Sequence, residues 1–359
     1  MAVKRIEANP LIRPFDVPPS RPDFEVVGAF NPGVIEYNGQ ILLLLRVAER
    51  PKNKSSDEQI APILNTHTGQ IEIFCVHNDD LNITDIPDTR TFFYKDRMYL
   101  TSISHFRLAR SRDGIHFEVD PDPTIFPAMP YETYGLEDPR ITQIEETFYI
   151  TYKAVSEHGI CTALITTQDF ENFTRHGIIF CPENLDVVLF PEKINGQFWA
   201  LTRPVPRNLG PLGIWIASSP DGIHWAKHQP LLAPREECFD SARIGASCVP
   251  IHTERGWIEI YHGADANNRY CLASVLLDLN HPNQVLARSN LPLLEPEADY
   301  EQHGFFGNVV FSCGTIKQAG GSILLYYGAS DEYTAGAVLT IDDLYYSLEA
   351  DRQDTSVCR

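Results

Sequence analysis

The sequence has few basic residues for its length. It contains 29 lysines and arginines against 48 aspartates and glutamates, which gives a formal net charge of −19 over 359 residues. Polyanions are bound by clustered Lys and Arg side chains, so this composition argues against nucleic acid and anionic membranes as partners. The same negative field opposes capture of an anionic substrate. A site for such a substrate must therefore gather the few basic residues in one pocket.

Long apolar runs and paired cysteines are also missing. No window approaches the roughly 18 apolar residues of a membrane-spanning helix, and Met1 to Pro10 lacks the apolar core of a signal peptide. We therefore expect a cytoplasmic protein. The eight cysteines include no Cys-x-x-Cys pair, which argues against a metal site or a redox motif. We expect most of them to be buried thiols in strands.

Convincing helical stretches are scarce. Short runs of Val, Ile, Leu, Phe, Tyr and Trp recur between turn signals along the chain, which is typical of an all-β fold. With 43% hydrophobic and 21% charged residues, the composition suits a globular protein with a sizeable core. We expect a single domain over 1–359, with a polar, frayed tail at about 349–359.

A unit of four strands can be found six times along the chain. Its first strands begin near Asn31, Asp88, Asp138, Val187, Arg243 and Asn308. The intervals of 57, 50, 49, 56 and 65 residues suit four-stranded blades. Two near-identical heptapeptides, SRDGIHF at 111–117 and SPDGIHW at 219–225, mark the same turn in two units. The sequence thus predicts a six-bladed β-propeller, which a strand at about Val3 to Ile6 would close.

Charged residues interrupt the apolar strands of nearly every unit. A charge inside such a strand is costly unless it is paired or functional, although any single one could simply face solvent. In a propeller, the first strands line the central pocket, where sites are commonly found. The polar residues at these positions, in the second strands and in one late turn are Asn31, Arg46, Asp88, Arg90, Glu137, Asp138, Arg140, Lys153, Lys193, Arg203, Arg243, His262 and Asp331.

Carboxylates, cations and aromatic rings together suit a sugar site, and glycoside cleavage needs an acid near the leaving oxygen. Asp138 is the best candidate for this acid. Its neighbour Glu137 carries a like charge, which should raise one of the two carboxyl pKa values and keep that group protonated. The structural alternative for Asp138-Pro139 is a turn that ends a strand.

The segment YGLEDPRIT at 134–142 resembles the hallmark of glycoside hydrolase family 130, whose members are mostly mannoside phosphorylases. Other segments match in order: NP at 31–32, LLLR at 43–46, LFPEKING at 189–196, RP at 203–204, RIGA at 243–246, YHG at 261–263, and YYGA at 326–329 followed by Asp331. The resemblance covers roughly residues 25 to 340.

The resemblance implies a phosphorylase that cleaves β-1,4- or β-1,2-linked mannosides with inversion and releases α-mannose 1-phosphate. Asp138 would be the general acid, its proton reaching the glycosidic oxygen through a mannose hydroxyl. Combining the resemblance with strand position, we assign substrate binding to Asn31, Arg46, Asp88, Arg90, Glu137 and Asp331. Phosphate binding is assigned to Arg140, Lys193, Arg203 and His262. Inorganic phosphate is the co-substrate, and no metal or other cofactor is implied.

Two features depart from the family pattern. Leu185 stands where many of the phosphorylases carry Arg or Lys, so one expected phosphate ligand is missing. An inverting β-mannoside hydrolase is therefore the alternative, with a base among Glu183, Glu192, Glu236 and Asp240. The stretch from Pro51 to Arg107 gives a sixth unit where five blades are the family norm, so it could instead elaborate the first blade.

A non-catalytic propeller that binds sugar is the second alternative, although it would not need an acid beside a basic cluster. The expected partners are an oligosaccharide and phosphate, and a homo-oligomer stays open. The linkage and the acceptor sugar depend on loops around the channel mouth, for which the sequence offers no physical discriminator.

Overall fold

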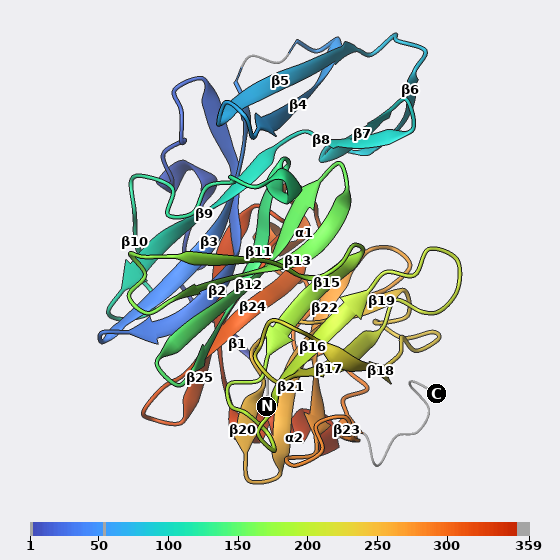
Figure 1. Ribbon diagram of the computed structural model, residues 1–359. Coiled ribbons are helices and arrows are strands. Elements are labelled where there is room, and N and C mark those ends of the chain that lie inside the picture. Colours follow the sequence, from blue (N-terminus) through green and yellow to red (C-terminus); the bar gives the residue numbers. More distant parts are fainter. Residues whose placement is uncertain (1–2, 53–54, 350–359) are drawn as a thin grey trace.

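The computed structural model describes residues 3–52 and 55–349, and most of them lie in β-strands (Figure 1). The described helices are short: two α-helices, α1 (Asp299–Gln302) and α2 (Ile341–Glu349), and two 3-10 turns, Pro14–Asp16 and Pro130–Glu132. The expectation of an all-β protein is confirmed. No helix in this part of the chain is both long and apolar enough to cross a membrane.

Five groups of four antiparallel strands follow one another along the chain, here called sheets I to V. Sheet I contains β2 (Phe24–Tyr37), β3 (Gln40–Pro51), β9 (Ile103–Ser111) and β10 (Glu118–Val119). Sheet II contains β11 (Gly135–Ile144), β12 (Thr147–Ser156), β13 (Gly159–Thr167) and β14 (Thr174–Phe180). Sheet III contains β15 (Asn184–Leu189), β16 (Phe198–Pro204), β17 (Ile214–Ser219) and β18 (Ala226–Leu232).

The last two sheets complete the series. Sheet IV contains β19 (Arg243–Ala246), β21 (Gly256–Ala264), β22 (Tyr270–Leu277) and β23 (Val285–Arg288), and the short β20 (Ile251–Thr253) also pairs with β21. Sheet V contains β24 (Val310–Lys317), β25 (Ser322–Ala329), β26 (Tyr333–Thr340) and β1 (Lys4–Arg5). One parallel bridge, between Gly135 and Ser104, joins sheets I and II.

The hydrophobic core lies between neighbouring sheets. Separate clusters of buried side chains fill the interfaces I/II, II/III, III/IV, IV/V and V/I. Strand β3 shows the local reason: Leu42 and Leu44 pack toward sheet II, whereas Leu43 and Leu45 pack toward sheet V. Because side chains alternate along a strand, a continuous apolar run is what a sheet buried on both faces requires.

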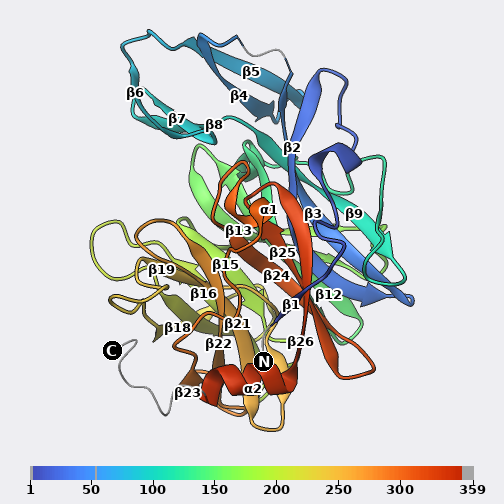
Figure 2. The same ribbon diagram turned by 180° about the vertical axis from the view of Figure 1, so that it is seen from behind.

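The stretch expected to form the second of six units forms no four-stranded sheet. It contains a two-stranded sheet of β4 (Glu58–Asn65) and β5 (Gln70–His77), and a three-stranded sheet of β6 (Ile83–Asp88), β7 (Thr91–Tyr94) and β8 (Arg97–Leu100). Both lie at one end of the molecule in the two views (Figure 1, Figure 2). Strand β9 pairs with β3 instead. The prediction of six units is therefore wrong at its second copy, and the stretch is an insertion into sheet I.

The N-terminal segment pairs with the last strands of the chain. Lys4 lies opposite Val338 and Arg5 opposite Ala337, so a strand forms within the segment expected at Val3 to Ile6 and pairs with the last sheet. Helix α2, which was not expected, follows β26 and buries Leu344 and Leu348 against sheets IV and V. Of the tail expected at about 349–359, all but the first residue lies outside the described part of the chain.

Candidate active site

Three inner strands bulge at a polar residue. The register of β2 shifts between Phe30 and Gly33, that of β11 between Glu137 and Arg140, and that of β15 between Leu185 and Val188. A bulge bends a strand and redirects a side chain. The residues at the three bulges, each in the left-handed region with φ of 45°, 47° and 54°, are Asn31, Asp138 and Asp186. Strands β2, β11 and β15 lie side by side, so the three buried side chains meet.

Asp138 accepts hydrogen bonds on both carboxylate oxygens. Lys153 Nζ lies 2.6 Å from Oδ2, while Asn31 Nδ2 and Arg46 Nη1 lie 2.8 Å and 3.1 Å from Oδ1. Burial raises the pKa of Asp138, but the charges of Lys153 and Arg46 outweigh it and hold the pKa well below its usual value. Asp138 is therefore ionised in this state of the protein.

Asp186 lies at the centre of a cluster of nitrogen atoms. Arg203 Nε is 2.6 Å away, Lys153 Nζ 3.0 Å, Arg140 Nη2 3.3 Å and His262 Nε2 3.5 Å. Burial raises the pKa of Asp186, but Arg203 and Lys153 outweigh it and keep the pKa well below its usual value. We call Arg140, Lys153, Arg203 and His262 the cationic cluster.

Backbone carbonyls and a serine hold two members of the cluster in place. The Arg140 guanidinium donates to the carbonyl oxygens of Asp138, Ala246 and Ser247. His262 Nδ1 lies 3.1 Å from Ser247 Oγ. Burial lowers the pKa of His262 well below its usual value, with the nearby arginines in the same direction, so its imidazole is neutral. The cluster thus carries three permanent positive charges.

A second layer of charges borders this centre. Arg46 Nη2 donates to Glu137 at 2.6 Å, and Arg90 Nη1, from the turn between β6 and β7, donates to Asp331 at 3.1 Å. Arg90 also binds Asp88 at 2.9 Å. Burial raises the pKa of Glu137 and likewise that of Asp331. The raised carboxyl pKa that the sequence predicted for this pair therefore belongs to Glu137. The pKa of Asp138, the proposed acid, is lowered instead.

Two residues named from the sequence have their partners elsewhere: Arg243 donates to Tyr270 Oη and Asn268 Oδ1, and Lys193 lies apart from the centre. Its Nζ binds Glu145 Oε1 at 3.0 Å at the surface, beyond the end of β15. The expected phosphate ligand is thus not brought to the cluster, because the chain leaves the centre after the apolar LFP run. Lys153 lies at the cluster instead of Lys193. The sequence pointed to Lys153 through a charged residue within the apolar strand TFYITYKA.

Asp186 and Phe311 are the other residues that sequence reasoning did not assign to the site. Asp186 occupies the first strand of its unit, as Asn31 and Asp138 do, and this shared position was the signal. The Phe311 ring lies 4.5 Å from the ring of His262, with Lys153 Nζ 5.4 Å from its centroid. No signal in the sequence distinguished Phe311 from core aromatic residues.

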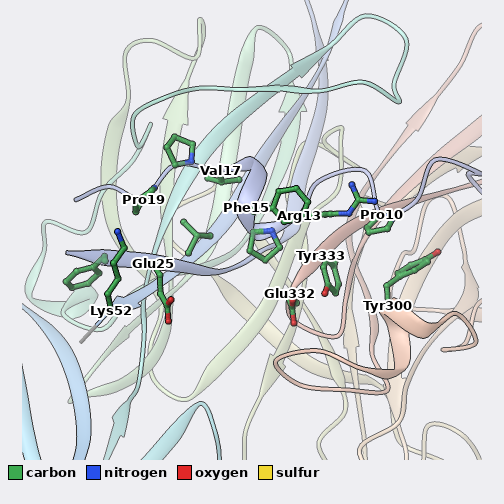
Figure 3. A pocket seen from close by; sticks show the side chains of 14 residues that line it. Pro10, Arg13, Phe15, Val17, Pro19, Glu25, Lys52, Tyr300, Glu332 and Tyr333 are labelled. Carbon is green, nitrogen blue, oxygen red and sulfur yellow. The ribbon is translucent and has the colours of Figure 1, made fainter. Parts of the chain in front are cut away.

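A cavity of about 640 Å³ lies away from this centre, between the N-terminal segment, the start of β2 and the turn after β25 (Figure 3). Arg13, Phe15, Lys52, Tyr300 and Tyr333 are among its lining residues. None of the residues around Asp138 or Asp186 lines it. The chemistry of the site therefore belongs to the buried charges and not to this surface cavity.

Comparison with known proteins finds relatives that match most or nearly all of the chain. A family model described as beta-1,4-mannooligosaccharide phosphorylase matches residues 89–349. A beta-1,2-mannobiose phosphorylase of Listeria innocua serovar 6a is 49% identical, over 98% of this chain and 99% of that protein. A beta-1,4-mannooligosaccharide phosphorylase of Ruminococcus albus is 35% identical, over 65% of this chain and 73% of that protein.

The similarity extends to three dimensions. The structure of the Listeria innocua beta-1,2-mannobiose phosphorylase in complex with beta-1,2-mannobiose superposes with a TM-score of 0.94, covering 98% of this chain and all of that one. The family model covers well over half of the chain, and the whole-length relative is far above the identity at which folds are shared. This chain belongs to glycoside hydrolase family 130.

Proposed function

We propose that the protein is a β-mannoside phosphorylase that transfers mannose to inorganic phosphate with inversion and releases α-mannose 1-phosphate. The observation that supports this proposal most strongly is the cationic cluster beside Asp138. It gathers three permanent positive charges at one buried point of a chain whose net charge is −19. Charge-assisted hydrogen bonds from such a cluster can hold an anion in spite of the negative surface. The similarity to two phosphorylases supports this function.

In this proposal, Asp138 supplies the proton to the leaving oxygen and the cationic cluster holds phosphate. Asn31 and Asp331 bind the mannose, with Arg46, Glu137, Asp88 and Arg90 at the border of the site. The buried Oδ1 of Asn31 has no hydrogen-bond partner among the described residues. Lys193 has no part in the site. Because the whole-length relative is a beta-1,2-mannobiose phosphorylase, β-1,2-mannobiose is the first substrate to test.

The absence of a basic residue at position 185 does not favour hydrolysis. Lys153 lies between Asp138 and Asp186 and adds a cation to the cluster. An inverting hydrolase needs a second carboxylate that activates water. Of the four residues considered for that base, Asp240 is held by Arg235 and Arg288, and Glu183, Glu192 and Glu236 are exposed.

The arrangement that supports this site is a five-bladed β-propeller. Each of the sheets I to V packs on the next, and sheet V packs on sheet I, which is how blades close a ring around a central site. We also propose a cytoplasmic location, where a sugar phosphate is retained, and phosphate as the co-substrate with no further cofactor. Assembly into a homo-oligomer is left to measurement of the mass in solution.

The test is release of mannose 1-phosphate from β-1,2- and β-1,4-mannobiose, with and without phosphate. Release should depend on phosphate and fall by about 100-fold or more in Asp138→Asn, because the acid is lost. Lys193→Ala is the matched control and should keep the KM for phosphate, since Lys193 lies outside the cluster. Free mannose released at the same rate without phosphate would refute the phosphorylase.

A further inference from the structure

Lys153 is shared between the two carboxylates of the site. Its Nζ lies 2.6 Å from Asp138 Oδ2 and 3.0 Å from Asp186 Oδ1, and the residue is only 8% exposed. One ammonium group therefore touches both the proposed acid and the centre of the proposed phosphate site. Any anion that binds to the cationic cluster will compete with Asp138 for this ammonium group.

Among the described residues, every side chain that hydrogen-bonds to the Asp138 carboxylate is a donor. Asn31, Arg46 and Lys153 all donate to its oxygens, and none of them can accept a proton from it in this arrangement. A general acid must nevertheless hold a proton when the glycosidic bond breaks. These three donors therefore favour the carboxylate form of Asp138, which cannot donate the proton that the reaction needs.

The charges around Asp138 indicate what would allow this carboxylate to take up a proton. The charged and titratable groups that face Asp138 are Arg46 of β3, Glu137 and Arg140 of β11, Lys153 of β12, Asp186 of β15, Cys313 of β24 and Asp331 between β25 and β26. The three cations of the cluster and Arg46 contact the two carboxylates Asp138 and Asp186, and Arg46 is also bound by Glu137. A phosphate dianion adds two negative charges to this group, which favours uptake of one proton.

We propose that phosphate binding protonates Asp138. Phosphate draws Lys153 toward itself, and Asp138, having lost part of its positive surroundings, takes one proton from solvent. Asp186 keeps its contacts to Arg203 and Arg140 and stays ionised. This inference rests on the proposed phosphorylase function. It adds a requirement: the acid becomes competent only when the nucleophile is in place.

The proton and the charges balance through the reaction. A phosphate oxygen bonds to the anomeric carbon while the bond from that carbon to the glycosidic oxygen breaks. The leaving oxygen receives the proton that Asp138 gained, either directly or through a mannose hydroxyl. Asp138 is then a carboxylate again, bound by Lys153. Water entering without phosphate would meet an unprotonated acid, which explains why hydrolysis would be slow.

The experiment is calorimetric titration of the full-length protein with inorganic phosphate, in two buffers with different heats of ionisation, at the pH of fastest turnover. The difference between the buffers gives the protons taken up per phosphate. The wild type should take up about one proton more than Asp138→Asn, and its phosphate Kd should rise about tenfold more per unit of pH. The subtraction removes protons exchanged by phosphate itself.

His262 is the competing acceptor, and a second variant tests it. His262→Gln should bind phosphate more weakly but keep the extra proton. Equal proton uptake in the wild type and in Asp138→Asn would overturn the inference, as would loss of the proton in His262→Gln. If phosphate does not bind alone while mannose 1-phosphate is still released, this inference is wrong and the phosphorylase stands. If neither occurs, the proposed function itself fails.

Discussion

Asp186 is the residue on which the cationic cluster depends most directly. Removal of one partner from a buried ion pair leaves the other charges without compensation, which costs roughly 3–5 kcal/mol. Here three cations would face one another after its removal.

We expect Asp186→Ala to lower the free energy of unfolding by about 3 kcal/mol, measured by urea denaturation. Added phosphate should restore part of that loss, because an anion can replace the missing carboxylate. Asp79→Ala, which removes an exposed carboxylate, is the control and should change neither quantity. Unchanged stability of Asp186→Ala would show that the cations are not held by this residue.

Arg90 is the residue through which the insertion reaches the site. It pairs with Asp331 at 3.1 Å, and its guanidinium lies 3.5 Å from the centroid of the Phe306 ring. We expect Arg90→Ala to raise the KM for mannobiose about tenfold, the equivalent of about 1.4 kcal/mol, and to leave the KM for phosphate nearly unchanged.

The control for this substitution lies in the same insertion. Arg97 forms an exposed ion pair with Glu157, and Arg97→Ala should leave both KM values unchanged. An effect of Arg90→Ala on phosphate alone would instead place Arg90 on the phosphate side of the site.

At the scale of elements, the two repeated heptapeptides adopt the same turn. The Asp113 carboxylate accepts from the backbone N–H groups of Ile115 and His116, and Asp221 accepts in the same way from Ile223 and His224. The glycine that follows each aspartate has a positive φ, 77° for Gly114 and 78° for Gly222. Because the two turns have the same geometry, they need the same residues, which explains why the two segments share a sequence.

The two glycines differ in their surroundings, which gives a matched pair. A Cβ on Gly114 would lie 2.8 Å from Tyr326 Oη, whereas a Cβ on Gly222 would lie 3.4 Å from Phe198 Cδ1. We expect Gly222→Ala to cost about 1 kcal/mol from backbone conformation alone, and Gly114→Ala to cost about 1–3 kcal/mol more from crowding. Urea denaturation measures both, and equal losses would show that Tyr326 moves aside freely.

At the scale of the whole molecule, the N-terminal strand β1 pairs with β26 of the last sheet. Arg5 bonds to Glu301 and Glu297, each at 2.8 Å, and the side chain of Glu301 is fully buried. Strand β1 is thus held by an ion pair to Glu301 of helix α1 as well as by strand pairing with β26 (Figure 2).

We expect Arg5→Ala to lower the free energy of unfolding by about 3 kcal/mol, because Glu301 loses its counter-charge. Lys4→Ala, at the neighbouring exposed position of the same strand, should have little effect. Thermal and urea unfolding both measure the change. Equal effects of the two substitutions would indicate that the attachment of β1 depends on its backbone pairing with β26 and not on the ion pair.

The sequence by itself determined the all-β class and the strand at its N-terminus, and it singled out Asn31, Asp138, Arg140, Arg203 and His262, which the structure brings together. These features follow from local patterns, namely alternating apolar residues, turn residues and charges inside apolar strands. Such patterns report burial, which is why they succeed for strands and for buried polar residues.

Only the tertiary structure decided that five and not six groups of four strands form, that Lys153 and not Lys193 reaches the centre, and that the pKa of Asp138 is lowered while that of Glu137 is raised. The physical reason is common to all three. The partner of a strand, the neighbours of an ammonium group and the charge of a carboxyl group each depend on residues brought together from distant parts of the chain.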